Sequence, residues 1–416
     1  DMRRRRVAAA AALAVAVVGG GAIAPASAAP AASADAVRDA EYWLDGYGVR
    51  SAWQVTRGAG VTIAVIDTGV GNPRDLQGAV VGGADFSGRG SSDGRTPVGR
   101  DGHHGTLVAS LAAGRGTGAG SGVIGSAPEA SVLAISIGFE SGGSDDQIAE
   151  AVRWAVDNGA DVINMSLTRN TLDWPESWDD AFLYAAENDV VVVAAAGNRG
   201  SGTDVVGAPA TMPGVLTVAG VDRSGAPSRD ASTQGVTIAV AAPSEDLVGV
   251  MPDGTYVRWS GTSGAAPIVA GVVALVRAAH PELDAANVIA RITATARDAG
   301  EPGPDVAYGF GLLDADAAVR AQVAPVDANP MGDLAEWVRV NRPHDAEAAA
   351  VRPGPAPLVR ETPREEPFDP VGVLLPSPLQ LSRVGAPLLG ALVVAYVALG
   401  FLAGLVISFK RGRRAR

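Results

Sequence analysis

The stretch Val61-Thr-Ile-Ala-Val-Ile-Asp-Thr-Gly69 decides the fold, because it is a short β-branched run that ends at a carboxylate and a glycine. A run of this length and composition between turn residues predicts a strand that is buried on both faces. Such strands form parallel sheets, in which the side chains that follow the strands gather at one edge. We therefore expect Asp67 at the carboxyl edge of a parallel sheet.

Similar runs recur along the chain and alternate with longer, helix-like patterns. Further strands are predicted at residues 131–137, 161–165, 190–195 and 215–219, and helices at residues 104–113, 144–158, 178–188 and 262–279. This alternation predicts an α/β domain with a mostly parallel sheet and helices on both faces.

Composition limits the classes of function. The 416 residues are ample for a large buried core. The net charge of −12 at pH 7 argues against nucleic acid as a partner. The chain has no cysteine, which excludes thiolate metal sites, cysteine nucleophiles and disulfides.

The N-terminal end has the pattern of a secretory signal. Basic residues 3–6 precede an apolar run at 7–18 and the small residues Ala26-Ser-Ala28. This predicts a signal peptide at residues 1–28; a membrane anchor is the alternative, but the run is short for a bilayer span.

The C-terminal end predicts a membrane anchor. Residues 388–409 contain no charge and are followed at once by basic residues, so we expect a transmembrane helix over 384–409 and a cytoplasmic tail at 410–416. A buried core helix is the alternative. Before it, residues 324–383 are rich in proline, arginine and glutamate, without sustained periodicity. They predict a Pro-rich tether.

Asp67 is ambiguous when it is considered alone. Asp-Thr-Gly also marks aspartic proteases, but those enzymes need two such carboxylates and the chain has one copy. An aspartate that simply ends a strand in a turn is the structural alternative.

Two of the four histidines remain as candidates for a base. His344 lies in the predicted tether and His280 precedes a proline at a helix end, whereas His103 and His104 lie at the start of a predicted helix. His103 and His104 could suggest a metal site. Neighbours on a helix, however, point about 100° apart, and no His-x-x-x-His pattern follows.

Ser263 and Asn198 are candidates for nucleophile and oxyanion donor. Ser263, in Gly261-Thr-Ser-Gly-Ala-Ala-Pro267, opens a helix whose N–H groups favour a developing negative charge; a simple N-cap is the alternative. Pro267 is compatible with the first helical turn. Asn198 follows a strand in Ala194-Ala-Ala-Gly-Asn198, where its amide can donate to an oxyanion or form a turn.

The order Asp, His, Asn, Ser, with each motif intact, resembles the subtilisin family (subtilases) over residues 60–319. The resemblance implies a subtilisin-like three-layer fold with a protease domain at residues 60–323, and a serine endopeptidase that hydrolyses protein or peptide substrates. It also implies the following site residues: Asp67, His104 and Ser263 as catalytic triad, Asn198 in the oxyanion hole, and Ser166 and Leu167 in substrate binding.

Three positions depart from the family pattern. His103 stands where a glycine usually precedes the histidine, Thr168-Arg169 replaces a glycine pair after Leu167, and Gly264 replaces a larger apolar residue after the serine. We expect these changes to alter the surroundings of His104 and the substrate-binding edge.

The segment Tyr42-Trp-Leu-Asp-Gly-Tyr47, the tether and the single C-terminal helix resemble the mycosins, membrane-anchored subtilases associated with type VII secretion in actinobacteria. The resemblance implies that residues 29–59 wrap onto the protease domain, which lies outside a cell membrane spanned once. Membrane proteins of the secretion complex are then possible partners. The alternatives are a structural subunit with secondary protease activity, or a generic anchored cell-surface subtilase. The lack of cysteine departs from mycosins, which commonly carry disulfides. We expect no cofactor and no catalytic metal. No loop has a clear calcium-binding pattern, but scattered aspartates and backbone oxygens leave a structural calcium site as the alternative.

Overall fold

We describe a computed structural model of the chain, which covers residues 32–139, 144–342, 358–359 and 366–368. The predicted signal peptide, most of the predicted tether, and the predicted transmembrane helix and basic tail lie outside these residues.

Seven strands form the central sheet, in the order β2-β3-β1-β4-β6-β7-β8. Every neighbouring pair is parallel, which confirms the predicted fold class. The strands are β1 (Thr62–Asp67), β2 (Val80–Asp85), β3 (Ser131–Ser136), β4 (Val162–Met165), β6 (Val191–Ala195), β7 (Leu216–Val221) and β8 (Ile238–Pro243).

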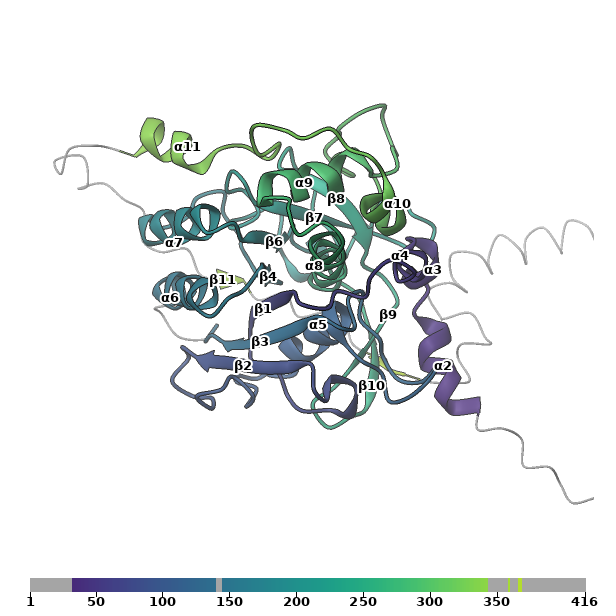
Figure 1. Ribbon diagram of the computed structural model, residues 1–416. Coiled ribbons are helices and arrows are strands. Elements are labelled where there is room, and N and C mark those ends of the chain that lie inside the picture. The colour runs from purple at the N-terminus through teal and green to yellow at the C-terminus, as the bar shows by residue number, and fades with distance from the viewer. Residues whose placement is uncertain (1–31, 140–143, 343–357, 360–365, 369–416) are drawn as a thin grey trace, which may run out of the picture.

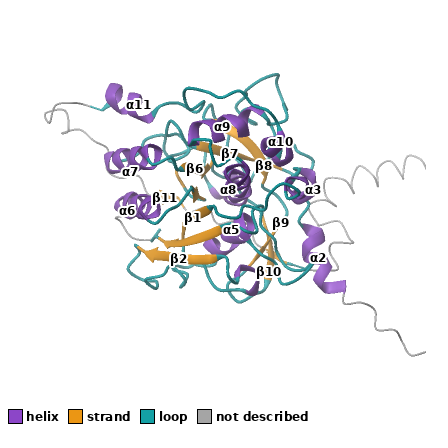
Figure 2. Ribbon diagram, in the orientation of Figure 1, coloured by secondary structure: helices purple, strands orange, loops and turns teal. Residues whose placement is uncertain are grey.

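Helices cover both faces of this sheet (Figures 1 and 2). α6 (Ser144–Asp157) and α7 (Glu176–Glu187) lie on one face, and α5 (His104–Ala113) and α8 (Thr262–Ala279) on the other. The chain after α8 adds α9 (Ala285–Ala294) and α10 (Ala315–Arg320). The result is a three-layer α/β architecture.

α8 is long and apolar because it is a core helix. Among the described residues it is the helix with the length and hydropathy of a membrane span, yet 89% of it is buried inside the protein. A helix that is hydrophobic all round is expected in one of two surroundings, a large core or a membrane. The predicted C-terminal span is a separate segment and lies outside the described residues.

The N-terminal segment packs into the same core. It forms α2 (Ala32–Ala40), α3 (Trp43–Gly46) and α4 (Val49–Ala52), and Trp43 and Leu44 are fully buried. Glu41 accepts a hydrogen bond from the Ile124 N–H at 2.8 Å and pairs with Arg38 at 2.9 Å. Burial raises the pKa of the Glu41 carboxyl well above its usual value.

The start of the predicted tether differs from the expectation of irregular chain. α11 (Leu334–Asn341) lies against α7, and the Trp337 and Trp174 rings are 4.3 Å apart between centroids. Arg342, directly after the helix, forms an ion pair with Asp179 of α7 at 2.5 Å. Aromatic burial and this ion pair dock the segment, although its neighbourhood is rich in proline and charge.

Two small sheets complete the fold. One contains β9 (Leu247–Val250), β10 (Tyr256–Trp259) and β12 (Glu366–Pro367), and the other β5 (Thr168–Arg169) and β11 (Leu358–Val359). The 3₁₀ turns η1 (Arg74–Leu76) and η2 (Arg199–Ser201) lie in loops.

Replacement of Trp43 by alanine tests whether the N-terminal segment is part of the core. The cavity left by a fully buried indole should lower the free energy of unfolding by about 3–5 kcal/mol, measured by denaturant titration. Val55→Ala is the control, because Val55 is 48% exposed and should change stability little. Equal stability of the two variants would contradict this packing.

Candidate active site

The carboxyl ends of three sheet strands carry the polar residues singled out in the sequence. Asp67 ends β1, Ser166 follows β4, and Asn198 lies just beyond β6. Because β1, β4 and β6 are parallel neighbours, these residues gather at one edge of the sheet. α5 and α8 begin at the same edge and bring His104 and Ser263 to it.

Asp67 and His104 form a buried pair. Nδ1 of His104 lies 2.9 Å from both carboxylate oxygens of Asp67. Asp67 is 0% exposed and His104 is 2% exposed. An Nδ1–H that donates to the carboxylate leaves Nε2 as the proton-accepting nitrogen. Nε2 is buried and has no hydrogen-bond partner within the described part of the chain. The pair therefore holds an imidazole ready to accept a proton.

Close packing fixes the position of His104. A Cβ on Gly105 would lie 2.3 Å from the Gly69 carbonyl oxygen, so only glycine lets α5 approach the end of β1. Trp259 packs edge-on against the imidazole, with ring centroids 6.0 Å apart. His103 precedes the helix with φ of −65°, a conformation that any residue adopts, and it is partly exposed. The backbone at residue 103 therefore does not require the glycine that is usual there.

Ser263 is fully buried in the first turn of α8 and forms two hydrogen bonds with Ser166. Its Oγ donates to the Ser166 carbonyl at 3.3 Å, and its own carbonyl accepts the Ser166 hydroxyl at 2.9 Å. The hydrogen bond from the Ser166 hydroxyl to the Ser263 carbonyl is explained by the sequence of α8. The Ser263 carbonyl would normally accept the N–H of residue 267, which is a proline and has none.

The expected first-turn location of Pro267 is therefore wrong. α8 begins at Thr262, so Pro267 lies inside the helix. The Ser166 hydroxyl supplies the donor that the proline lacks, and Asn164 Nδ2 holds that hydroxyl at 3.0 Å. The Ser166 hydroxyl thus replaces the N–H donor that Pro267 lacks and joins the end of β4 to Ser263.

Asn198 is oriented by Thr262. Its Oδ1 accepts the Thr262 N–H at 2.7 Å and the Thr262 hydroxyl lies 3.1 Å away. The amide nitrogen Nδ2 is consequently turned toward Gly261, where a Cβ would lie only 2.9 Å from it. The arrangement places an amide donor beside the start of α8, where a negative charge next to Ser263 would develop.

Ser166 and Leu167 do not present their side chains to solvent, since they are 3% and 1% exposed. Their backbone leads directly into β5, which is the edge that the sequence predicted to differ from the family. Gly264 is explained by packing: a Cβ there would lie 2.3 Å from Leu247 Cδ1, so the space for a larger residue is already filled.

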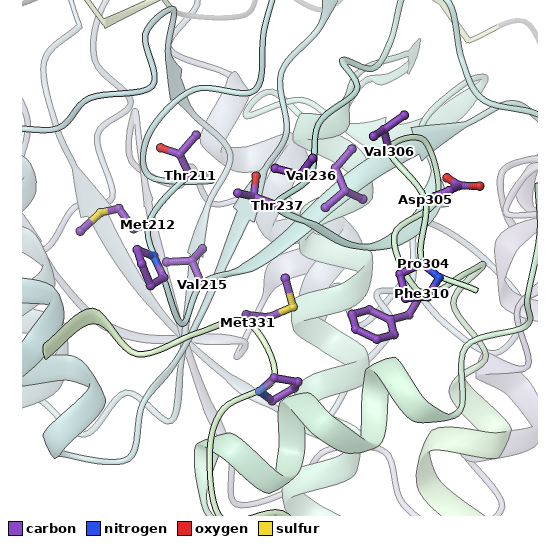
Figure 3. A pocket seen from close by; sticks show the side chains of 13 residues that line it. Thr211, Met212, Val215, Val236, Thr237, Pro304, Asp305, Val306, Phe310 and Met331 are labelled. Carbon is purple, nitrogen blue, oxygen red and sulfur yellow. The ribbon is translucent and has the colours of Figure 1, made fainter. Parts of the chain in front are cut away.

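The described part of the chain also has a cavity away from these residues. The described residues contain no group of three His, Cys, Asp or Glu that could hold a metal ion. A cavity of about 370 Å³ lies at the opposite, amino ends of β7 and β8 (Figure 3). Apolar side chains such as Met212, Val215, Phe310 and Met331 dominate its lining, and it contains none of the predicted site residues.

Comparison with known proteins shows the family to which the chain is similar. The sequence model of the Subtilase family matches residues 58–311. Subtilisin DY of Bacillus licheniformis is 37% identical over 64% of this chain and 92% of its own length. Mycosin-3 of Mycobacterium tuberculosis is 36% identical over 76% of this chain and 77% of its own length.

Solved structures give the same result. MycP1 with its N-terminal propeptide removed has a TM-score of 0.59 and 32% identity, covering 70% of this chain and 99% of that one. The MycP3 protease from the type VII (ESX-3) secretion system has a TM-score of 0.57 and 33% identity, covering 68% and 88%.

A double-mutant cycle tests the link between Ser166 and Pro267. Ser166→Ala removes a donor from the Ser263 carbonyl and should lower the free energy of unfolding by about 1–3 kcal/mol. Pro267→Ala restores an N–H that can donate to the same carbonyl. It should therefore raise the free energy of unfolding more in the Ser166→Ala background than in the wild type. Removing the proline also makes the unfolded chain more flexible, but this cost is the same in both backgrounds and cancels in the cycle. Strictly additive effects would contradict the compensation.

Proposed function

Because the chain belongs to the subtilase family and is a mycosin-like, subtilisin-type serine protease, we propose that Asp67, His104 and Ser263 are its catalytic triad. The observation that carries this proposal is the buried Asp67–His104 pair with its unpartnered Nε2, close to the start of α8. Protein or peptide chains are the substrates that this activity requires.

Each member has one task in the acyl-transfer reaction. Ser263 Oγ turns from the Ser166 carbonyl toward His104, gives its proton to Nε2 and attacks the scissile carbonyl carbon. Asp67 holds the imidazole by Nδ1 and stabilises its protonated form. The imidazolium then gives the proton to the leaving amine, and water, activated by the same nitrogen, hydrolyses the acyl-enzyme.

Two donors receive the negative charge on the carbonyl oxygen: the Ser263 N–H at the helix N-terminus and the Asn198 amide. Thr262 fixes that amide before substrate binds, so little reorganisation is needed when the charge appears. Ser166 and Leu167 contribute backbone that leads into the substrate-binding edge.

Ser263→Ala should abolish both peptide hydrolysis and covalent labelling by a fluorophosphonate, because the attacking oxygen is gone. Labelling is measured on the folded protein by gel fluorescence. Ser224→Ala is the control, since its hydroxyl bonds Asp222 in an exposed turn. A folded wild-type protein that does not label would contradict the proposed activity.

Asn198→Ala should lower kcat by about 10²–10³-fold with little change in KM, because the amide acts on charge present only in the transition state. This magnitude is the loss known for the oxyanion-hole asparagine of subtilisin itself. Steady-state kinetics on a peptide substrate measure the effect, and an unchanged kcat would remove Asn198 from the oxyanion hole.

The cellular role that we propose is that of an anchored protease supporting a type VII secretion system. Two observations support it. The predicted C-terminal span and basic tail have the pattern of a single-pass anchor. The similarity to Mycosin-3 covers 76% of the chain, whereas the similarity to subtilisin DY covers 64%.

A structural role in the secretion system is the second candidate. It is favoured by the similarity to a solved protease, MycP1, that is described as an essential component of the type VII (ESX-1) secretion system. Membrane fractionation and purification of the full chain in detergent test the anchor and the partners, and secretion by the Ser263→Ala variant separates the two roles. We expect the chain in the membrane fraction, with co-purifying secretion-complex membrane proteins. Retention of secretion by Ser263→Ala would favour the structural role, and purification without any partner would favour a generic anchored subtilase.

A further inference from the structure

Two short pieces of the C-terminal region lie on the body of the protein as added strands (Figure 1, yellow). β11 pairs antiparallel with β5, and β12 pairs antiparallel with β10. β5 directly follows Ser166 and Leu167, and β10 ends at Trp259, whose ring packs on His104. Both attachment points are therefore segments that lead into the proposed catalytic residues.

We propose that Leu358–Val359 occupies the edge of β5 that receives the backbone of a peptide substrate, so that the chain's own tether competes with substrate. The proposal rests on the proposed protease function. It makes the tether an internal inhibitor that an extended substrate must displace.

β5 has one edge available for a strand. The Arg169 N–H donates to the Ala208 carbonyl at 2.8 Å, so on this side β5 is already paired with the body. Backbone groups of successive strand residues face opposite sides, which turns those of Thr168 toward β11. The register places Val359 opposite Thr168. The ladder hydrogen bonds of β11 therefore fall at the Thr168–Val359 pair.

Side-chain contacts hold β5 in place. Arg169 forms an ion pair with Asp145 of α6 and lies over the Trp178 ring of α7, 5.6 Å from its centroid. Arg169 is 4% exposed and Thr168 is fully buried. A strand anchored in this way cannot shift to accept a second partner on the same edge, so substrate and β11 exclude each other.

β11 runs in the same direction as the substrate residues on the amino side of the scissile carbonyl, which form the acyl side of the substrate. β5 runs away from Ser166 and hence from Ser263, and its antiparallel partner runs toward them from its N- to its C-terminal residue. In a substrate, the residues on the amino side of the scissile carbonyl must also approach the nucleophile in this direction. Strand addition of this kind gives affinity through main-chain hydrogen bonds.

The second attachment keeps the competing strand nearby. Glu366 and Pro367 pair with Arg258 and Val257, and the Phe368 N–H donates to the Tyr256 carbonyl at 3.0 Å. The Arg258 guanidinium lies 5.6 Å from the Phe368 ring centroid. Attachment within one chain gives β11 an effective concentration on the order of millimolar, which is high enough to compete with substrate.

Two single proline variants of the full chain test the proposal. Val359→Pro removes the N–H that pairs with Thr168, whereas Leu358→Pro removes an N–H that faces away from β5 and is the matched control. We expect Val359→Pro to lower the apparent KM for a peptide extended on its acyl side about three- to tenfold, with kcat unchanged. Leu358→Pro should leave KM close to the wild-type value.

Labelling by a small fluorophosphonate separates this inference from the function on which it rests, because the probe reacts at Ser263 without needing the β5 edge. Equal labelling of the three proteins with a lower KM for Val359→Pro alone supports the internal inhibitor. Equal labelling with an unchanged or higher KM for Val359→Pro overturns it, as does an equal decrease for both prolines. A wild type that does not label overturns the protease function itself.

Discussion

The close packing of α5 against α8 is the constraint on which the rest of the structure depends. A Cβ on Gly271 of α8 would lie 2.8 Å from the Ala112 carbonyl oxygen of α5, so the two helices meet with no space for a side chain between them. Both helices are almost fully buried on the same face of the sheet. Their first turns are thereby fixed relative to each other, and these turns carry His104 and Ser263.

The sheet supplies the other half of the site, and hydrogen bonds join the two halves. Thr262 connects α8 to the end of β6, and Ser166 connects it to the end of β4. The second connection exists because Pro267 leaves a helical carbonyl without its usual donor. A proline inside a helix is normally unfavourable. Here the Ser263 carbonyl that Pro267 leaves free accepts the Ser166 hydroxyl, and this bond holds the first turn of α8 against the sheet.

Sequence reasoning predicted those parts of the fold that depend on local pattern. α5 and α8 have the predicted limits because their apolar runs start at clear boundaries, and the strand predicted within Val61–Gly69 runs from Thr62 to Asp67. β2 was missed because it contains Gly82 and Gly83 in place of a β-branched run. At Gly83 a Cβ would lie 2.1 Å from the Ala134 carbonyl oxygen. The task of the Ser166 hydroxyl and the pairing of β11 depend on partners far along the chain, and no local pattern indicates them.

Two of the three departures from the family pattern, at Gly264 and at Arg169, are explained by partners far along the chain. Gly264 is small because Leu247 fills its space, and the hairpin of β9 and β10 that carries Leu247 also carries Trp259 against His104. Arg169 replaces a glycine whose conformational freedom would leave β5 adaptable. Its contacts with Asp145 and Trp178 instead make β5 a fixed edge. A fixed edge binds an extended strand with less loss of entropy than an adaptable one, whether that strand comes from a substrate or from the tether. Arg169 therefore strengthens the binding of a substrate strand and the binding of β11 at the same edge. A substitution in β5 alone changes both and cannot separate them.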